Sequence, residues 1–579
     1  MLAFAVEQQR LRFVWTPLLG VLLALARPEG LLVDVGLVLG MLWVLASATR
    51  VGLPRAAASG RAAVAVLPLL VGLLQVLLYR VLTGSGQANG ILAKSWWHQG
   101  DTPQPTEVAD HALGNVQALL STLSGLAAQD LVPPGTGALA VIGLVALGLR
   151  AAPRWRTFAV ALGVGLGLVL VSVSTLITAL WQNLRYIQPF LPLVLLLAVV
   201  GVHALVGVAA DAPRRRVALH GVLAVGLVFS LATTPTWALR LAQQAATIRE
   251  APVSIGNWLA GHVPPGSVVA ANDVGAVAYF SGRPVLDVVG LTTEGVADAA
   301  NNGPGTLYEK LVHLPPSQRP AYFSIYAAWG GVPVQDLARS GVLGDDPIIS
   351  FYLKSPARPL VGLAPPPCQT DRVCDVVNVW KADWGLVDSG AGPDRPVPGA
   401  VRDRVNVGDL DDEAAHGWAV DNPVLGLQPA SDVTRQTLAP GRTVVDSSRH
   451  VVGGEIFTLH HLVPGRPVVL TTRVAPRADG SRPAAETDAT ANPAPTASAE
   501  RAPTEIDGQA VALTVDDRPV GRWYFTAPGS ARSEGWLQSQ TVIPAELVTG
   551  PDLTVRTGPL QTFLGPYPDY WSYGYWASQ

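Results

Sequence analysis

Residues 11–49 read LRFVWTPLLGVLLALARPEGLLVDVGLVLGMLWVLASAT, and this stretch decides the fold class. Two apolar segments, Leu11–Ala26 and Leu31–Thr49, flank the turn Arg27-Pro28-Glu29-Gly30. A helix needs about 20 mainly apolar residues to cross the hydrocarbon core of a bilayer. The second segment comes near that length, whereas the first is short and needs flanking residues or local thinning of the bilayer. The stretch therefore predicts two membrane helices joined by a charged turn.

The same apolar pattern returns along the first 237 residues. Five further segments have it: Ala62–Thr83, Leu131–Leu149, Thr157–Trp181, Ile187–Ala209 and Val217–Trp237. The whole chain is 49% hydrophobic and 14% charged, whereas an average soluble domain is about one-quarter charged. We therefore expect a polytopic α-helical membrane domain of about seven spans over residues 1–237, and a purely soluble enzyme is excluded. The net charge of −3 gives no indication of nucleic-acid binding.

Arginine is concentrated in alternate short loops between these segments. The positions are Arg10 and Arg12, then Arg50, Arg55 and Arg61, then Arg150, Arg154 and Arg156, then Arg214, Arg215 and Arg216. Short loops rich in Lys and Arg stay on the cytoplasmic side, so this set predicts the orientation. The turn 27–30, the loop 84–130, the turn 182–186 and everything after residue 237 then face outward. We expect a multi-pass protein of the cell membrane with a large extracytoplasmic C-terminal region.

The polar half divides into two expected domains. Residues 238–390 alternate between helix and strand patterns, which favours a small α/β domain. Residues 400–579 carry short alternating strands between turns and predict an all-β, jelly-roll-like sandwich. Residues 477–504 are rich in Ala, Pro, Thr and Ser, and predict a disordered insertion. The aromatic stretch Tyr567–Trp576 either stacks on sugar rings or completes the core of the sandwich.

Cys368 and Cys374 are the only two cysteines. On the outer side of the membrane they would form a short-loop disulfide, and the alternative is two free thiols. No second Cys or His pair lies near them in the sequence, so we expect no metal site there.

Two turns on the predicted outer side carry charge. Arg27 and Glu29 lie between two apolar segments, and they either form a local ion pair or take part in binding. Arg185 is the only charge in its turn, and Tyr186 follows it. A guanidinium can hold a phosphate in a bidentate grip, although a snorkelling side chain at the end of a span would give the same sequence.

The predicted outer loop 84–130 supplies the remaining acidic candidates. Thr106–Gln129 has the pattern of a helix lying on the membrane or on the helix bundle. Asp101, Glu107 or Asp110 would act as a general base only if the fold brought one within reach of a hydroxyl group. The alternative is that all three are solvated loop charges. Asp34 lies inside a span, where we expect it to be satisfied within the bundle.

The order of these features resembles the GT-C superfamily of membrane glycosyltransferases, which includes protein O-mannosyltransferases and the lipid A aminoarabinose transferase. The resemblance rests on Ala-Arg-Pro-Glu-Gly after an apolar helix, on a later Arg-Tyr-x-x-Pro, and on the stretches 270–280 and 285–291 of the tail. It covers about residues 1–300.

The resemblance implies transfer of a sugar from a polyprenyl-phosphate donor to a glycan, protein or lipid acceptor of the cell envelope, without a cofactor. It also implies that Arg185, Tyr186, Arg27 and Glu29 contact the donor phosphate. In that superfamily the catalytic acid lies in a first outer loop, several helices before the turn that occurs here at residue 27. The resemblance therefore implies a chain shortened at its N-terminus, and no catalytic residue is carried over. The alternative function is a non-catalytic, membrane-anchored carbohydrate-binding or scaffold subunit of envelope glycan assembly.

Overall fold

The computed structural model divides into two compact units. One is helical and is built from residues 1–97 and 105–245, and the other is built mainly from residues 246–579. The structure describes residues 2–84, 86, 88–100, 105–125, 131–150, 152–209, 211–326, 334–344, 346–352, 376–421, 430–476, 510–524, 535–559 and 568–579. Asp101, Cys368, Cys374 and the predicted insertion 477–504 lie outside these residues.

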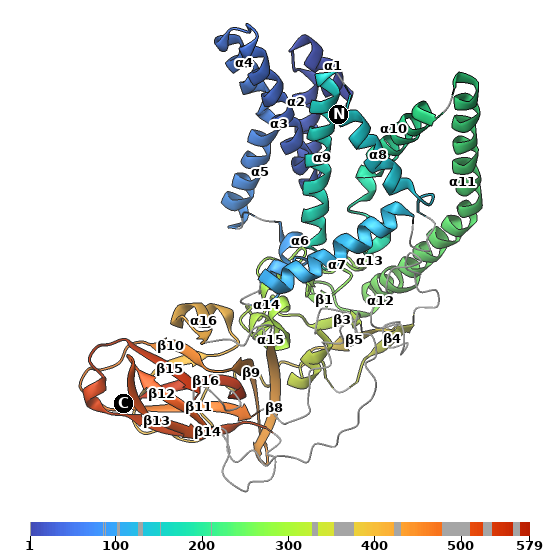
Figure 1. The fold of residues 1–579 in the computed structure, drawn as a ribbon. Helices are drawn as coiled ribbons and strands as arrows, with labels where there is room; N and C mark the ends of the chain where they lie inside the picture. Colours follow the sequence, from blue (N-terminus) through green and yellow to red (C-terminus); the bar gives the residue numbers. More distant parts are fainter. Residues whose placement is uncertain are drawn as a thin grey trace, which may run out of the picture. The chain divides into compact units, whose positions relative to one another are not determined.

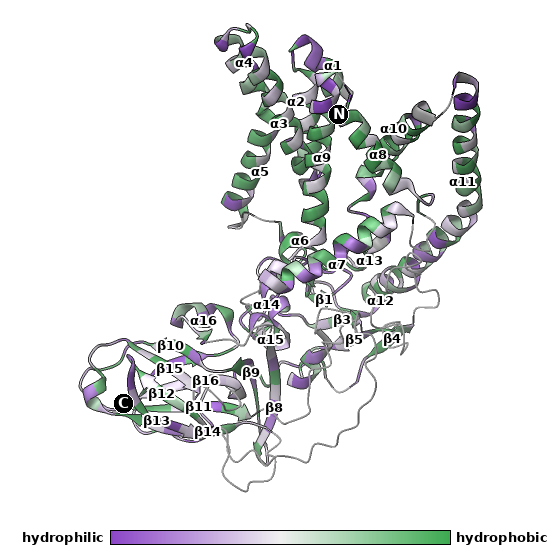
Figure 2. Cartoon of the chain, in the orientation of Figure 1, coloured by the Kyte–Doolittle hydropathy of each residue, from purple (hydrophilic) through white to green (hydrophobic). Residues whose placement is uncertain are grey.

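Helices make up the first unit (Figure 1). The longer ones are α1 (Leu2–Arg10), α2 (Trp15–Ala26), α3 (Pro28–Arg50), α4 (Arg55–Ala65), α5 (Leu67–Thr83), α7 (Pro105–Ser124), α8 (Thr136–Gly148), α9 (Pro153–Ser174), α10 (Leu191–Ala209) and α11 (Ala212–Ile248). Shorter turns are α6 (Asn89–Leu92) and the 3-10 helices η1 (Trp96–His98), η2 (Gln182–Leu184) and η3 (Gln188–Phe190). Apolar residues predominate along α3, α5, α9 and α10 (Figure 2).

Within the described residues, four helices are long and apolar enough to cross a membrane, and a fifth span results if the bent pair α4 and α5 counts as one. The four comprise Glu29–Arg50, Pro153–Ser174, Gln188–Gly207 and Pro213–His262. Helices α2 and α8 are apolar but shorter than a span. Each of the seven predicted segments thus contains a helix, but the number of seven spans is not confirmed.

The junction of α2 and α3 follows from local chemistry. Arg27 adopts an extended conformation, with φ −156° and ψ 140°, and Pro28 starts α3 at a position where its missing N–H costs nothing. At the other end of α2, the carboxylate of Glu7 accepts hydrogen bonds from the backbone N–H groups of Val14, Trp15 and Thr16. These bonds satisfy free donors of the first turn of α2.

Glycines allow the close crossing of α8 and α10. A Cβ atom on Gly143 would lie 1.9 Å from the backbone oxygen of Leu197, and one on Gly201 would lie 2.0 Å from that of Leu139. Small residues at such crossings let the two helix backbones approach closely. Close packing matters in a membrane, because lipid tails are as apolar as the helices and give no hydrophobic driving force for association.

Helix α9 ends earlier than the predicted span Thr157–Trp181. The backbone from residue 175 leaves the helix and pairs with the segment around Lys94 and Trp96, because Ile177 N donates to Lys94 O at 2.8 Å and Trp96 N donates to Thr175 O at 2.9 Å. Asn115 of α7 also donates its amide to the backbone of this region. Residues 175–190 therefore form an irregular segment braced by the predicted outer loop.

The second unit begins with a mixed five-stranded sheet in the order β2-β1-β3-β5-β4. Its strands are β1 (Val269–Ala271), β2 (Val285–Asp287), β3 (Tyr322–Tyr326), β4 (Ile349–Tyr352) and β5 (Val376–Lys381). Strand β1 pairs in parallel with β2 and β3, and β5 pairs antiparallel with β3 and β4. The helical elements of this part are the π-helical turn η4 (Arg249–Val253), α12 (Ser254–His262), α13 (Val274–Ser281), α14 (Val296–Asn302), α15 (Pro304–Val312) and the 3-10 helix η5 (Val334–Ser340).

The rest of the unit is a β-sandwich of two antiparallel sheets (Figure 1). One sheet has the order β13-β12-β15-β10-β7, and the other has the order β14-β11-β16-β9-β8, with β6 also paired to β16. The elements are β6 (Val401–Asn406), α16 (Leu410–His416), β7 (Ala419–Val420), β8 (Ser431–Ala439), β9 (Arg442–Val452), β10 (Glu455–Leu459), β11 (Val468–Pro476), β12 (Ala510–Val515), β13 (Arg518–Tyr524), β14 (Leu537–Ile543), the 3-10 helix η8 (Ala545–Leu547), β15 (Leu553–Pro559) and β16 (Asp569–Ser578).

The aromatic stretch at the C-terminus is a central strand. In β16, Tyr570, Tyr573, Tyr575 and Trp576 are all buried. Of the two interpretations that the sequence left open, the structure therefore supports completion of the core, because buried rings have no face free for a sugar.

The mixed sheet and the sandwich share a hydrophobic core. Val433 of β8 and Val445 of β9 belong to the same buried cluster as Leu307 of α15 and Phe323 of β3. The start of α15 also lies directly against β8, since a Cβ atom on Gly305 would come within 2.3 Å of the backbone oxygen of Asp432. These two parts of the chain are thus packed as one body.

Candidate functional site

A cavity of about 310 Å³ lies within the helical unit. Along α2 it is lined by Thr16, Gly20 and Leu23, and along α3 by Gly30, Val33 and Leu37. Pro189 and Phe190 of η3 and Leu193 at the start of α10 also line it. Its volume is at the low end of the range for small-molecule sites. Because most of these side chains are apolar, the cavity suits an apolar chain.

Arg27 is the charged residue of the lining. Its Nε atom lies 3.3 Å from a carboxylate oxygen of Glu29, and the Arg27 side chain remains 39% exposed. The local ion pair that the sequence allowed is therefore present. The guanidinium still has exposed surface with which to meet an anionic group at this end of the cavity.

The two motifs noted in the sequence meet at this cavity. Arg27 and Gly30 come from the first turn, and Pro189 comes from the Arg-Tyr-x-x-Pro stretch. The sequence did not indicate the remaining lining residues, because one apolar residue among many gives no signal of its own. Gly20 was also not singled out, although a glycine within a helix often marks a close approach and is the one such signal that could have been used.

Arg185 and Tyr186 form a second polar cluster. Arg185 Nη2 donates to the Tyr186 hydroxyl at 3.0 Å, its guanidinium lies 4.9 Å from the ring centroid, and Thr178 shares the same hydroxyl. Burial would raise the pKa of Tyr186, but these hydrogen bonds and the charges of Lys94 and Arg185 together lower it. The cluster is therefore electropositive, yet Arg185 and Tyr186 do not belong to the cavity lining.

The acidic candidates do not meet at the cavity. Glu107 and Asp110 lie in the first two turns of α7 and are not among the lining residues, and Asp101 lies outside the described residues. The cavity lining contains no Asp or Glu from the described part of the chain. No general base is thus placed against the cavity there.

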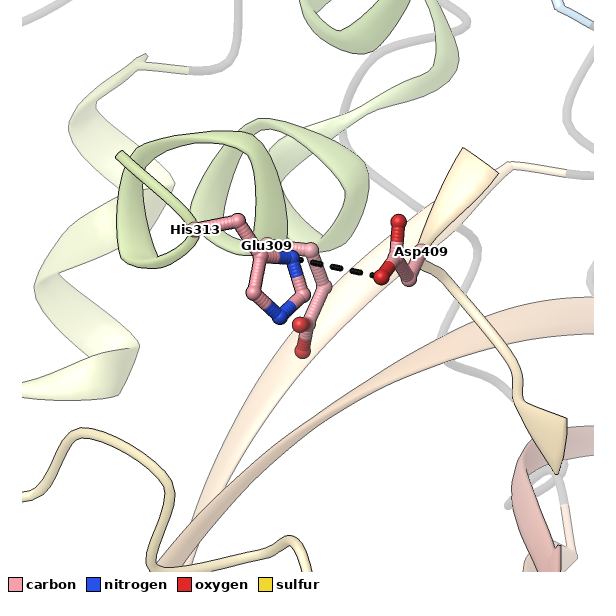
Figure 3. Close-up of side chains that lie close together, drawn as sticks. All are labelled: Glu309, His313 and Asp409. Atoms are coloured by element: carbon pink, nitrogen blue, oxygen red, sulfur yellow. Dashed lines mark ion pairs between the residues drawn. The ribbon is translucent and has the colours of Figure 1, made fainter. Parts of the chain in front are cut away.

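A second cluster of ionisable side chains lies in the other unit (Figure 3). Glu309 and His313 are one helical turn apart at the end of α15, and both face Asp409, which precedes α16. His313 Nδ1 lies 3.2 Å from an Asp409 oxygen, and ligand atoms of all three lie within 4.8 Å of one another. This residue set could hold a divalent cation.

Protein partners already satisfy this cluster. The oxygens of Glu309 accept hydrogen bonds from Ser447 at 2.7 Å and Asn406 at 3.1 Å. Asp409 caps α16 by accepting from the backbone N–H of Asp411 and also pairs with His313. We therefore interpret the cluster as a structural link between α15 and the sandwich.

Two buried groups in residues 246–579, Glu309 and His416, make the stability of this unit depend on pH. Burial raises the pKa of Glu309 from 4.5 to about 7, despite its hydrogen bond from Ser447. A hydrogen bond to Asp403 raises the pKa of His416 from 6.5 to about 9, against the effect of burial. Both groups hold their protons more tightly in the folded chain, so the folded state loses stability as these protons leave.

We expect the free energy of unfolding of residues 246–579 to fall as pH rises from about 5 to about 9, by at most about 1.4 kcal/mol per pH unit for each proton. The effect of Glu309 belongs to the lower part of this range and that of His416 to the upper part. Urea unfolding of the full chain in detergent, monitored by hydrogen exchange, measures this free energy. Glu309→Gln is expected to make the lower part less steep and His416→Gln the upper part, while Glu413, whose pKa burial raises to about 8, still contributes in both variants. A free energy that rises with pH contradicts this account.

Comparison with known proteins gives one family match. Residues 239–388 match the model of a domain of unknown function, DUF8728. The matched residues include the mixed sheet. No protein with a curated description matches the chain.

Two solved structures show weak likeness. An exo-beta-1,3-galactanase from Phanerochaete chrysosporium with beta-1,3-galactotriose has a TM-score of 0.18 and 8% identity, over 36% of this chain and 39% of that one. The module CBM27-1 from Caldicellulosiruptor saccharolyticus with mannohexaose has a TM-score of 0.18 and 11% identity, over 31% of this chain and 97% of that one. The chain thus spans well under half of the galactanase, and at these TM-scores neither likeness carries an argument about function.

Proposed function

We propose that this membrane protein binds a polyprenyl-phosphate-linked sugar on the extracytoplasmic side of the membrane and serves its transfer to an acceptor of the cell envelope, as a protein of the GT-C type. The observation that carries the proposal is the apolar cavity with Arg27 at one end, where two separate sequence motifs meet. The arginine distribution supports the sidedness, since it leaves the Arg27 turn opposite the arginine-rich loops.

The cavity fits the two halves of such a donor. An isoprenoid chain gains free energy by lying against the apolar faces of α2 and α3. A phosphate at the Arg27 end gains charge-assisted hydrogen bonds from the guanidinium. Glu29 pairs with Arg27 and leaves part of the Arg27 side chain exposed. Arg185 and Lys94 add further positive charge around Tyr186, outside the cavity lining.

In the transfer, an acceptor oxygen attacks the anomeric carbon while the bond from that carbon to the phosphate oxygen breaks. The hydroxyl proton goes to a carboxylate base, and the lipid phosphate leaves with its negative charge stabilised by arginine. The base is not among the described residues of the cavity lining, and Asp101, Glu107 and Asp110 are the candidates from the loop.

A second function has a specific observation in its favour. Because the described lining contains no carboxylate, a partner protein would supply the catalytic base, and this chain would act as a lipid-binding, non-catalytic subunit of glycan assembly. The sandwich would then serve as a scaffold or carbohydrate-binding module, which we propose to be jelly-roll-like. Release of sugar from a radiolabelled donor by the purified chain separates the two functions.

Filling the cavity tests the binding step. Leu23 lines the cavity, whereas its neighbour Leu22 is 55% exposed and does not. We expect Leu23→Trp to weaken binding of a radiolabelled polyprenyl-phosphate sugar by roughly tenfold, the effect of about 1.4 kcal/mol, and Leu22→Trp to leave it unchanged. Equal binding by both variants and the original chain rejects the cavity as the donor site.

A further inference from the structure

Asp34 is a buried acid in the helical unit that has no hydrogen-bond partner among the described residues. It lies six residues beyond Pro28 in α3, about 9 Å along the helix at 1.5 Å per residue. Its exposed fraction is 0%, and neither carboxylate oxygen has a hydrogen-bond partner among the described residues. The expectation that the bundle satisfies this side chain is therefore wrong.

The carboxyl group lies beside Gly20 of α2 and near Pro68 of α5. A Cβ atom on Gly20 of α2 would lie 2.7 Å from Asp34 Oδ1 and 2.8 Å from the ring of Pro68 in α5. The carboxyl group thus occupies the space that the glycine leaves free, where α2, α3 and α5 cross.

No charged side chain of a neighbouring element forms a hydrogen bond with it within the described chain. Helix α2 contains no charged residue, and the only one in α5 is Arg80, twelve residues beyond Pro68. The charged residues of the other elements packed on α3 are Glu7 and Arg10 of α1, Arg55 and Arg61 of α4, and Arg154 and Arg156 of α9. None of these forms a described ion pair or hydrogen bond with Asp34.

Glu7 shows how the same bundle treats a carboxylate. It is also buried, at 9% exposure, but it accepts three backbone hydrogen bonds and a fourth from the Thr16 hydroxyl at 2.7 Å. An isolated carboxylate in apolar surroundings carries a large solvation cost, whereas a neutral carboxylic acid avoids most of it. The contrast in hydrogen bonding therefore separates an ionised group from one that has taken up a proton.

We propose that Asp34 is an intramembrane proton-binding site, occupied in the packed state of α2, α3 and α5. Its ligand is a proton exchanged with solvent, and binding converts the carboxylate to a carboxylic acid without any other bond change. Loss of the proton leaves a bare charge at the crossing, which draws in water and separates α2 from α3. Gly20 belongs both to this crossing and to the wall of the cavity, so protonation of Asp34 is coupled to the shape of the cavity. The proposal rests on helix packing and stands independently of the proposed lipid ligand.

Infrared spectroscopy of the full chain in lipid nanodiscs at neutral pH tests the site, because protonated carboxyl groups have a carbonyl band that carboxylates lack. We expect this band to lose one group's intensity in Asp34→Asn and to keep it in the matched control Glu7→Gln. An unchanged band in Asp34→Asn, or loss in Glu7→Gln alone, overturns the proposal.

A second variant keeps the test decisive if Asp34→Asn does not fold. The added methyl group of Gly20→Ala presses on the carboxyl group, so we expect the band to shift in frequency. Gly167→Ala in α9 is the control, since a Cβ atom there would meet nothing within 4 Å. A band at the same frequency in both glycine variants and the original chain also overturns the proposal.

Discussion

Replacing Arg473 by alanine is expected to lower the free energy of unfolding of residues 246–579 by about 3–5 kcal/mol, the usual cost of breaking a buried ion pair by removing one partner. Arg473 is completely buried in β11. Its guanidinium donates to the carboxylates of Asp446 and Asp394 and to the backbone oxygens of Gly390 and Gly392.

The same guanidinium lies between two indole rings, 4.9 Å from the centroid of Trp536 and 4.8 Å from that of Trp576. Its removal leaves Asp446 buried without its cation and opens space in the core. The bonds to residues 390–394 also fasten the segment that joins the mixed sheet to the sandwich. The loss therefore affects both parts of this unit.

Chemical unfolding of the full chain, followed by tryptophan fluorescence, measures this effect. Arg522→Ala is the matched control, because Arg522 is an exposed arginine of β13 and its removal is expected to change the free energy by less than about 0.5 kcal/mol. Arg473→Lys is expected to recover only part of the loss, since an ammonium group cannot reproduce the planar fork. Equal stability of Arg473→Ala and Arg522→Ala would show that the buried network contributes nothing.

Arg27→Ala is expected to weaken binding of a polyprenyl phosphate by roughly thirtyfold, since a charge-assisted hydrogen bond is worth about 2 kcal/mol. Arg27 lines the cavity and keeps exposed surface, whereas the Arg185 guanidinium lies over the Tyr186 ring and outside the lining. Arg185→Ala is therefore expected to have the smaller effect on binding of the polyprenyl phosphate.

The headgroup contact has two controls. A neutral polyprenol is expected to bind the original chain and Arg27→Ala equally, because it has no charge for Arg27 to meet. Glu29→Gln is expected to retain phosphate binding, since it frees Arg27 from its ion pair. Thirtyfold weaker binding of the polyprenol as well would assign Arg27 a purely structural part.

Periodicity and composition predicted much of the fold. The seven apolar segments all contain helices, because long apolar runs admit few other structures in a membrane chain. The end of α9 could not be predicted, since residues 175–181 are as apolar as the rest of the expected span. The backbone leaves the helix there only because it pairs with the segment around Lys94. The role of the aromatic residues of β16 could not be predicted, because such residues suit both a sugar-binding face and a buried core.

Less of the candidate site could be predicted. Charge in an apolar setting drew attention to Arg27, but its place in the cavity depends on how α2, α3 and the start of α10 pack. The sequence predicts that the bundle satisfies Asp34, and only the three-dimensional arrangement shows that Asp34 lies beside Gly20 without a hydrogen-bond partner among the described residues. Contacts between distant segments have no signature in a single sequence.

The most direct test of the central claim is an experimental structure of the full chain with a bound polyprenyl-phosphate sugar. We expect isoprenoid density along α2 and α3 beside Leu23 and Val33, with the phosphate within hydrogen-bond distance of Arg27. Lipid density on another face of the bundle, with this cavity empty or filled by protein side chains, would contradict it.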